Sequence, residues 1–195
     1  YRAYGPLLLY PAYRTPDPEI GYLTRYAPGA RENGGLYTHA GLWAVQAECM
    51  LGRRRHAWDL LKRFWPVYRG MDPDRYQAEP YVSPGSVDGP QSPHYGRGGW
   101  TWYTGSAAWM LRVSTEWLLG VRPAWDGLLV EPCLPPRWKR FSMRRTFRGS
   151  TYLIDVSVEK GPAQMVVDGK PLDSRLVPVF GDGREHRVAG RIPPD

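Results

Sequence analysis

Prolines and glycines divide the first 103 residues of the chain and restrict where helices can form. The sequence has 20 prolines and 22 glycines in 195 residues, and many of them fall in two stretches, residues 1–37 and 67–103. Such residues interrupt regular hydrogen bonding, so we expect both stretches to be loops. Loops of this length in a compact protein are usually functional rather than simple connections. We therefore look for a functional site on these two loops.

Apolar residues recur at helical spacing between and after the loops. Residues 38–50 and 53–65 each show this spacing, and Gly52 separates them, which predicts two helices joined as an αα-hairpin. A third helix is predicted over 105–119, because its inner face repeats Ala108, Leu111, Thr115 and Leu118 and a proline follows at 123.

The pattern changes from helical spacing to alternation after residue 123. Residues 146–159 alternate apolar and polar side chains, as a half-buried strand does, and residues 165–172 enter an Asp-Gly turn. Further strands are predicted near Val177 and Glu185. The class is therefore α+β, with helices and loops over residues 1–123 and a small antiparallel β domain over 124–195.

Composition and the ends of the chain exclude several classes of protein. A hydrophobic content of 42% excludes a disordered tail, and no apolar run approaches the roughly 18 residues of a membrane span. Two cysteines cannot form a disulfide framework, and no secretion signal opens the chain. We expect a cytoplasmic protein with no membrane partner. The chain begins at Tyr1 without Met, which suggests a piece of something longer.

Aromatic residues make up 13% of the chain, and most of them are tyrosine or tryptophan. The chain has 13 Tyr and 9 Trp against 4 Phe. Tyr and Trp join a flat apolar face to a polar edge, which suits sugar rings, nucleobases and membrane interfaces. The net charge is +7, but the basic residues are scattered, with tight clusters at 53–55 and 144–145 and no nucleic-acid-binding motif around them. We expect no nucleic-acid partner.

One candidate site lies at the start of the first predicted helix. Residues 31–39 place Glu32, an amide and His39 just before the helix or in its first turn. Unpaired amide N–H groups there favour anions. The alternative is structural: Thr38 caps the helix and His39 packs underneath.

A second candidate site lies at the start of the third predicted helix. Thr104 as N-cap, followed by Gly105 and Ser106, offers backbone amides and two hydroxyls, which together suit an oxyanion or a phosphate. The segment is neither a Walker loop nor a dinucleotide fingerprint. Trp102 and its neighbours Trp100 and Tyr103 are either sugar-stacking platforms or core aromatics.

A proline-bounded loop carries Glu79 and Tyr81, which could hydrogen-bond a polyol. The alternative is a solvated loop acid. The four histidines show no metal-binding spacing, and no serine or cysteine nucleophile motif is present, so we expect no metal.

Eight segments of the sequence, taken in order, resemble one family. They are Glu32-Asn-Gly-Gly-Leu-Tyr-Thr-His39, Glu48-Cys-Met-Leu-Gly52, Glu79-Pro-Tyr-Val82, Trp102-Tyr-Thr-Gly-Ser-Ala-Ala-Trp109, Leu118-Leu-Gly-Val-Arg-Pro123, Asp126-Gly-Leu128, Pro132-Cys-Leu-Pro135 and Phe147-Arg-Gly-Ser-Thr-Tyr152. Together they look like the C-terminal part of the family 94 glycoside phosphorylases, over about residues 5–160.

The resemblance implies a fold and a reaction. The fold would be the C-terminal helices of an (α/α)6 barrel followed by a small antiparallel β-sandwich domain. The reaction would be inverting phosphorolysis of a β-glucosidic disaccharide or oligosaccharide to α-glucose 1-phosphate. Inorganic phosphate would be the co-substrate, with no other cofactor.

The resemblance also implies roles for individual residues. Those matching His39, Thr104 and Gly105 bind phosphate in the family, and the one matching Glu32 contacts sugar. The general-acid Asp and a phosphate-binding Arg of the family lie upstream of the matching segments, so we assign no catalytic residue to this chain. We expect the chain alone to be inactive and to need the remainder of the barrel, as an N-terminal part or a second chain. Full-length members commonly form homodimers.

The acceptor sugar and its linkage stay open. Cellobiose and chitobiose phosphorylases continue the Glu-Pro-Tyr-Val motif with Tyr-Ala-Gln, whereas this chain continues with Ser83-Pro84-Gly85. Residues 96–105 are more similar to members that act on β-1,2-glucans. Three alternatives remain: a non-catalytic carbohydrate-binding fragment, the phosphorylase-like region of a cyclic β-1,2-glucan synthase, and hydrolysis by a similar barrel.

Overall fold

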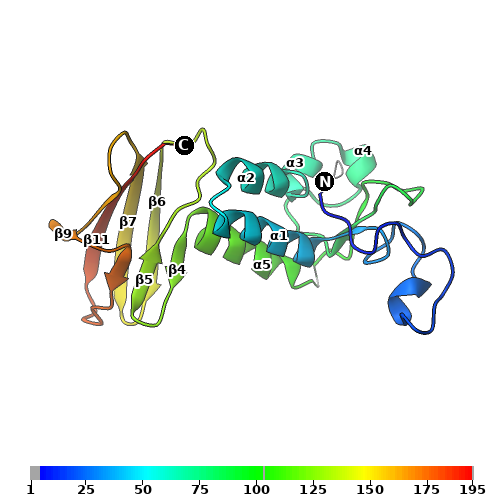
Figure 1. Ribbon diagram of the computed structural model, residues 1–195, viewed down its shortest axis with the longest axis horizontal. Coiled ribbons are helices and arrows are strands. Elements are labelled where there is room, and N and C mark those ends of the chain that lie inside the picture. The colour runs from blue at the N-terminus through cyan, green and yellow to red at the C-terminus, as the bar shows by residue number, and fades with distance from the viewer. Residues whose placement is uncertain (1–4, 103, 195) are drawn as a thin grey trace. The chain divides into compact units, whose positions relative to one another are not determined.

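The computed structural model describes residues 5–102 and 104–194, which form two compact units (Figure 1). The first unit is Tyr1–Val113 and contains the α-helices and the long loops, while the second is Ser114–Asp195 and contains a short π-helical stretch and two sheets. Helices together with antiparallel and mixed sheets confirm the α+β class. The predicted domain boundary at residue 123 stays a prediction. Within the described ranges no helix is long and apolar enough to cross a membrane.

The first unit is organised around helix α1, Thr38–Met50, which the sequence predicts with the same bounds. It packs against α2, Arg54–Lys62, and α5, Ser106–Arg112. Gly41 permits a close approach, since a Cβ there would lie 3.1 Å from Leu36 and 3.4 Å from the ring of Phe64. The buried apolar side chains of α1, α2 and the following turn are Leu42, Val45, Cys49, Ala57, Leu60, Leu61 and Phe64.

Helix α2 ends three residues before its predicted end at residue 65. The N–H groups of Arg63 and Phe64 bond to carbonyls three residues back, which tightens the last turn. Trp65 is extended, because the following proline disfavours a helical conformation before it. Pro66 then opens a new one-turn helix rather than simply ending the old one.

Two one-turn helices lie in the stretch that the sequence predicts to be loop. They are α3, Pro66–Arg69, and α4, Pro73–Tyr76, and each begins with proline, whose fixed φ suits a first helical position. A short 3₁₀ helix, η1, spans Tyr22–Arg25 in the first predicted loop. The prediction that these stretches contain only loop is wrong in both places. For α3 and α4 the reason is that a proline that breaks one helix can start another.

The third predicted helix, over 105–119, is present as two segments of different geometry. After α5 the chain continues as a π-helical stretch, η2, Val113–Leu118. There the N–H of Leu119 bonds to the carbonyl of Ser114, five residues back, at 2.9 Å. Apolar spacing predicts the extent of this segment but not its wider turn.

Three two-residue strands join the loops of the first unit into a small antiparallel sheet. They are β1, Leu36–Tyr37, β2, Ser86–Val87, and β3, Gly98–Gly99, in the order β1-β2-β3. Strands of two residues have no periodicity, and the sequence analysis places all three in loops. The sheet holds together the segments that precede α1 and α5.

Glycines allow the two long loops to touch through their backbones. A Cβ at Gly89 would lie 1.9 Å from the carbonyl oxygen of Gly34, so no larger residue fits there without a shift. The N–H of Gly89 also donates to the carbonyl of Gly29 at 2.7 Å. The loop around Asn33 and the loop around Gly89 are therefore fixed against each other.

The second unit is a two-layer β structure with one shared core. A three-stranded sheet has the order β10-β5-β4, and a five-stranded sheet has the order β6-β7-β11-β8-β9. Side chains from both sheets meet in a single apolar cluster, which includes Leu128, Val177, Tyr152 and Ile154. The strands are β4 Val121–Pro123, β5 Gly127–Val130, β6 Arg140–Phe147, β7 Ser150–Val158, β8 Gln164–Val167, β9 Lys170–Leu172, β10 Leu176–Pro178 and β11 Glu185–Ile192.

The prediction that this region is antiparallel needs one correction. Strand β11 pairs with β7 in parallel, so the larger sheet is mixed. Parallel neighbours need a long crossover, and β10, which belongs to the other sheet, lies on the connection between them. The predicted strand over 146–159 also begins too early, since a turn at Arg148-Gly149, both with positive φ, separates β6 from β7.

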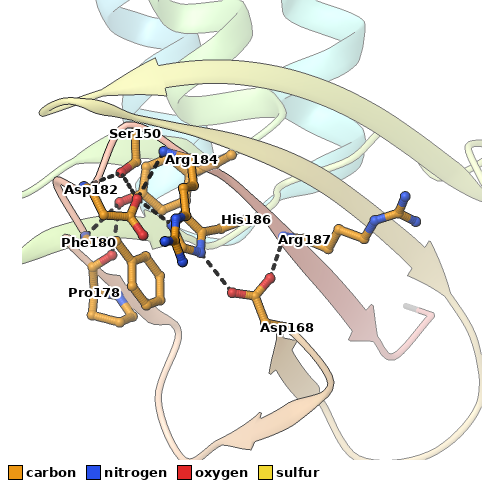
Figure 2. A network of polar contacts seen from close by, with 9 residues as sticks. Ser150, Asp168, Pro178, Phe180, Asp182, Arg184, His186 and Arg187 are labelled. Atoms are coloured by element: carbon orange, nitrogen blue, oxygen red, sulfur yellow. Dashed lines mark hydrogen bonds and ion pairs between the residues drawn. The ribbon is translucent and has the colours of Figure 1, made fainter.

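A buried histidine ties two turns to the five-stranded sheet (Figure 2). Nδ1 of His186 lies 2.7 Å from Asp168 in the β8–β9 turn, and Nε2 lies 3.0 Å from Asp182 in the loop before β11. The imidazole stacks on Phe180 with ring centroids 3.8 Å apart. Both ring nitrogens can donate to carboxylates only when the ring is protonated.

The two carboxylates are also held by backbone donors. The N–H of Arg187 donates to Asp168 at 2.8 Å, and the N–H of Arg184 donates to Asp182 at 3.0 Å. Hydrogen bonds that His186 donates to Asp168 and, second in effect, to Asp182 raise the pKa of His186. The hydrogen bond from His186 lowers the pKa of Asp182 to about 2.

These pKa shifts predict a pH window of maximum stability for the network. Because the pKa of His186 is higher in the folded than in the unfolded chain, its protonation stabilises the fold. This stabilisation is complete below the unfolded-state pKa of about 6.5 and is lost as pH rises through the folded-state pKa. The lowered pKa of Asp182 means that its ionised carboxylate stabilises the fold. This stabilisation is complete above about pH 3.9 and is lost as pH falls towards 2. We expect His186→Gln to have a lower melting temperature than wild type at pH 5.5. Between pH 5.5 and 8.5 the melting temperature should decline less in the variant than in wild type. An unchanged decline in calorimetric scans would contradict the assignment.

Candidate active site

The three-stranded sheet brings the start of α1 next to the segment that leads into α5. The N–H of Thr38 donates to the carbonyl of Gly85 at 3.0 Å, and the N–H of Gly85 donates to the carbonyl of Gly99 at 2.9 Å. A Cβ at Gly85 would lie 3.5 Å from Oγ1 of Thr104. Thr38 and Thr104, 66 positions apart in sequence, therefore flank the same glycine.

His39 faces Gly105 across this junction. A Cβ at Gly105 would lie 4.0 Å from Nδ1 of His39, and no other described residue outside the adjoining segment of the chain has an atom within 4 Å of that position. The imidazole lies among the rings of Trp43, at 5.0 Å, and Trp109, at 5.2 Å. Its Nε2 is buried and has no hydrogen-bond partner among the described residues. Packing therefore fixes the ring, and one nitrogen faces the backbone at the start of α5.

Thr104 is held in place by a network of hydroxyl groups. Its Oγ1 accepts from the N–H of Ser106 and donates to Oγ of Ser106, both at 3.1 Å. The buried Ser106 hydroxyl donates to the carbonyl of Pro84 at 2.9 Å and lies 2.9 Å from Oγ of Ser83. The sequence alone gives no sign that Ser83 and Pro84 support Thr104, because they are far from it along the chain. They anchor the segment that presents Thr104 and Gly105.

Glu79, Tyr81 and Trp102 form a second cluster, which we call the aromatic cluster. Nε1 of Trp102 donates to Oε1 of Glu79 at 2.8 Å, and this hydrogen bond lowers the pKa of the Glu79 carboxyl. The rings of Tyr81 and Trp102 meet edge to face with centroids 6.3 Å apart. Both rings are exposed, at 74% and 70% respectively. Three of the four residues predicted to bind sugar thus lie together.

The backbone around the aromatic cluster adopts unusual conformations. Trp102 has a φ of +72° and Trp100 a φ of +52°, both in the left-handed region that bulky residues rarely occupy. Such conformations persist where the surrounding structure enforces them, and they concentrate at functional sites. Tyr103, the third aromatic candidate of this segment, lies outside the described residues.

The fourth predicted sugar-binding residue, Glu32, is held by its neighbour in the chain. Its Oε2 is buried, has no hydrogen-bond partner among the described residues and lies 3.5 Å from Nε of Arg31. Arg31 also contacts Trp100, which links Glu32 to the segment that carries Trp102. The sequence analysis does not single out Arg31. Among the described residues, no group of three or more His, Cys, Asp or Glu could hold a metal ion.

Known proteins match both units of the chain. Residues 1–120 match the catalytic domain of the glycosyl hydrolase 94 superfamily, which is more than half of the chain. The chain belongs to the glycosyl hydrolase 94 superfamily. Residues 121–187 match the C-terminal domain of glycosyl hydrolase family 65. The family 94 resemblance that the sequence motifs suggest is confirmed.

Several relatives in family 94 are glycoside phosphorylases. The chain is 36% identical over 189 residues to a solabiose phosphorylase of Paenibacillus borealis, covering 95% of this chain and 25% of that protein. It is 34% identical over 178 residues to an N,N'-diacetylchitobiose phosphorylase of Vibrio furnissii, covering 89% of this chain and 22% of that protein. It is 40% identical over 163 residues to the cyclic beta-(1,2)-glucan synthase NdvB of Rhizobium meliloti (strain 1021), covering 82% of this chain and 6% of that protein. The chain spans a quarter or less of the length of these relatives.

A substitution that fills the space between His39 and Gly105 should weaken phosphate binding without affecting folding. Gly105 has a φ of −67°, which any residue adopts, so Gly105→Ala should fold normally while its methyl group occupies the space in front of His39. We expect the melting temperature to change by less than about 2 °C. The Kd for inorganic phosphate should rise at least about tenfold, or about 1.4 kcal/mol.

The matched control is Gly99→Ala, in the same segment, because a Cβ at Gly99 meets no atom within 4 Å. Calorimetric titration of phosphate into a complete catalytic domain containing this chain measures both variants. Equal phosphate affinity in the two variants would show that the anion lies elsewhere.

Proposed function

We propose that this chain supplies the phosphate-binding half of the active site of an inverting glycoside phosphorylase. The substrate would be a β-glucosidic disaccharide or oligosaccharide, cleaved by inorganic phosphate to α-glucose 1-phosphate. The observation that carries the proposal is the approach of His39 to Gly105 beside Thr104. It gathers a ring nitrogen, a hydroxyl and backbone amides at the positive end of α1, which suits a phosphate ion.

In this reaction, binding and orientation of phosphate account for much of the catalysis. A phosphate oxygen attacks the anomeric carbon, the bond from that carbon to the glycosidic oxygen breaks, and a general acid protonates the departing oxygen. His39, Thr104 and Gly105 would hold the phosphate in line for attack and neutralise part of its charge. The general acid is expected to be an Asp that the remainder of the barrel contributes.

The aromatic cluster and Glu32 would form the sugar-binding side of the site. The exposed rings of Tyr81 and Trp102 offer flat faces for a pyranose, and carboxylates accept hydrogen bonds from sugar hydroxyls. The hydrogen bond from Trp102 lowers the pKa of Glu79, so at neutral pH this carboxyl is ionised and acts only as an acceptor. Metal ions and organic cofactors have no role in this scheme.

The helices of the first unit would be completed by the remainder of an (α/α)6 barrel. Trp43, Met50, Leu51 and Leu111 are more than half exposed on or beside α1 and α5, and further helices would cover such apolar side chains. The remaining helices would come from an N-terminal part or from a second chain. The domain boundary at 123, a homodimer and a cytoplasmic location remain predictions from the sequence and the family resemblance.

The cyclic glucan synthase relative favours a second candidate function. Its identity of 40% is above that of the two phosphorylases described here, although it covers only 6% of that protein. The chain would then be the phosphorylase-like region of a cyclic β-1,2-glucan synthase. Phosphorolysis of β-1,2-linked sophorose compared with β-1,4-linked cellobiose distinguishes the linkages.

His39→Ala tests the proposed phosphate site. It removes the ring that faces Gly105, so we expect kcat/KM for phosphate to fall about 10²-fold or more, as for loss of a donor to developing charge. The assay is release of glucose 1-phosphate from cellobiose or sophorose in phosphate buffer by a complete catalytic domain.

His94→Ala, at an exposed histidine outside the described contacts of His39, is the matched control and should behave like wild type. If the wild-type enzyme releases no sugar phosphate, the chain is better described as a non-catalytic carbohydrate-binding fragment. Release of free glucose regardless of phosphate would instead indicate hydrolysis.

Substitutions of Trp102 test the sugar-binding side. Trp102→Ala removes both the ring and the hydrogen bond to Glu79, and we expect the KM for the disaccharide to rise about tenfold. Trp102→Phe keeps a ring and should raise this KM about threefold. The KM for phosphate should change less than about twofold in both variants. Equal changes in the two KM values would argue against a separate sugar-binding role.

A further inference from the structure

Arg31 contacts three residues in or beside the candidate site at once. Its guanidinium lies over the ring of Tyr26 at 4.7 Å and over the ring of Trp100 at 4.8 Å. Its Nε lies 3.5 Å from Oε2 of Glu32. A single side chain thus bridges Glu32 and the loop that carries Trp102.

The backbone of Arg31 is fixed in an unfavourable conformation. Its φ is +49°, in the left-handed region. A tight turn encloses it, in which the N–H of Gly29 donates to the carbonyl of Asn33 at 2.7 Å. A Cβ at Gly35 would lie 2.5 Å from the carbonyl oxygen of Arg31, so this glycine also presses against it. The side chain therefore starts from a position that the turn determines, and the strain marks a conformation that packing enforces.

Trp100 is the main residue through which Arg31 can act on the aromatic cluster. It packs against Gly85, where a Cβ would lie 3.0 Å from Cβ of Trp100. Its ring is 42% exposed and lies against the Arg31 guanidinium. We call residues 99–102 the tryptophan loop. Contact with Arg31 fixes the start of this loop two residues before Trp102.

The far side of the tryptophan loop has a different anchor. Thr104 is bound to Ser106, and Ser106 is bound to Pro84, without any contribution from Arg31. Trp100 and Thr104 both adjoin Gly85, but the side chains that hold them differ: Arg31 contacts Trp100, and Ser106 contacts Thr104. We expect a substitution of Arg31 to alter the positions of Trp102 and Glu32 more than that of Thr104.

The chemistry of these contacts requires arginine rather than any cation. A guanidinium is planar and can lie between two aromatic rings, while its N–H groups remain directed at a carboxylate in its plane. The ammonium of lysine is compact and strongly hydrated, so it keeps the charge but loses the stacking. Arg31→Lys therefore separates the stacking from the charge.

We propose that Arg31 is a positioning residue, which orients Glu32 and the tryptophan loop for sugar binding. This inference rests on the proposed function, because it takes Glu32 and Trp102 as sugar contacts. Arg31 itself touches neither phosphate nor the reacting atoms in this assignment. Its effect is specific to the sugar side.

The experiment compares Arg31→Lys with Ser106→Ala in a complete catalytic domain containing this chain. Arg31→Lys should raise the KM for the disaccharide about tenfold and leave the KM for phosphate within about twofold of wild type. Ser106→Ala should do the reverse, since it releases Thr104. A merely structural role for Arg31 would change both KM values together or lower the melting temperature, and either result overturns the proposal.

A double-mutant cycle tests whether Arg31 acts through Trp100. In a Trp100→Leu background, Arg31→Lys should raise the disaccharide KM less than about threefold, because the ring it positions is already absent. Fully additive effects would overturn the assignment.

Calorimetric titration of cellobiose and of sophorose without phosphate separates this inference from the proposed function. If wild type binds a disaccharide but releases no sugar phosphate, phosphorolysis is contradicted, and the Arg31→Lys titration still decides the role of Arg31. Weaker binding of that disaccharide by Arg31→Lys supports the positioning role. Equal binding overturns it, and no binding of either disaccharide by wild type overturns both proposals.

Discussion

Backbone contact between two long loops is the constraint on which the first unit depends. Gly34 and Gly89 meet with no space for a side chain, and the strands β1, β2 and β3 continue this contact as a small sheet. Because of this sheet, Thr38 at the start of α1 and Thr104 before α5 lie on either side of Gly85. Amide groups and a histidine from distant parts of the sequence then meet at one point, where they suit an anion.

The aromatic cluster uses the same scaffold but is supported differently. Trp100 and Trp102 hold left-handed conformations, and neighbouring contacts compensate for them: Arg31 for the first and Glu79 for the second. Thr104 depends on the buried hydroxyl of Ser106.

Sequence reasoning predicted the elements that have a repeating pattern and missed those that do not. Apolar spacing gave the bounds of α1, and alternation with an Asp-Gly turn indicated β8 and β9. The two-residue strands, the one-turn helices that begin with proline, and the parallel pairing of β7 with β11 depend on distant contacts. For the site, helix-start reasoning proposed His39 and Thr104. The predicted N-cap was wrong by one residue, since Gly105 is the N-cap of α5, and the proximity of Thr104 to the start of α1 required the structure. Arg31 was not assigned a role, and the Ser106 hydroxyl was expected to face an anion, whereas it is buried and donates to the carbonyl of Pro84. The partners of both residues are known only once the loops are folded.

The central claim is that an anion binds between His39 and Gly105, beside Thr104. Arsenate has the shape and charge of phosphate, and the anomalous signal of arsenic locates it without ambiguity. In crystals of a complete catalytic domain containing this chain, soaked with arsenate, the account predicts an arsenate within hydrogen-bond distance of the His39 ring and the Gly105 amide. Arsenate bound at another site, with the space between His39 and Gly105 empty, would contradict it.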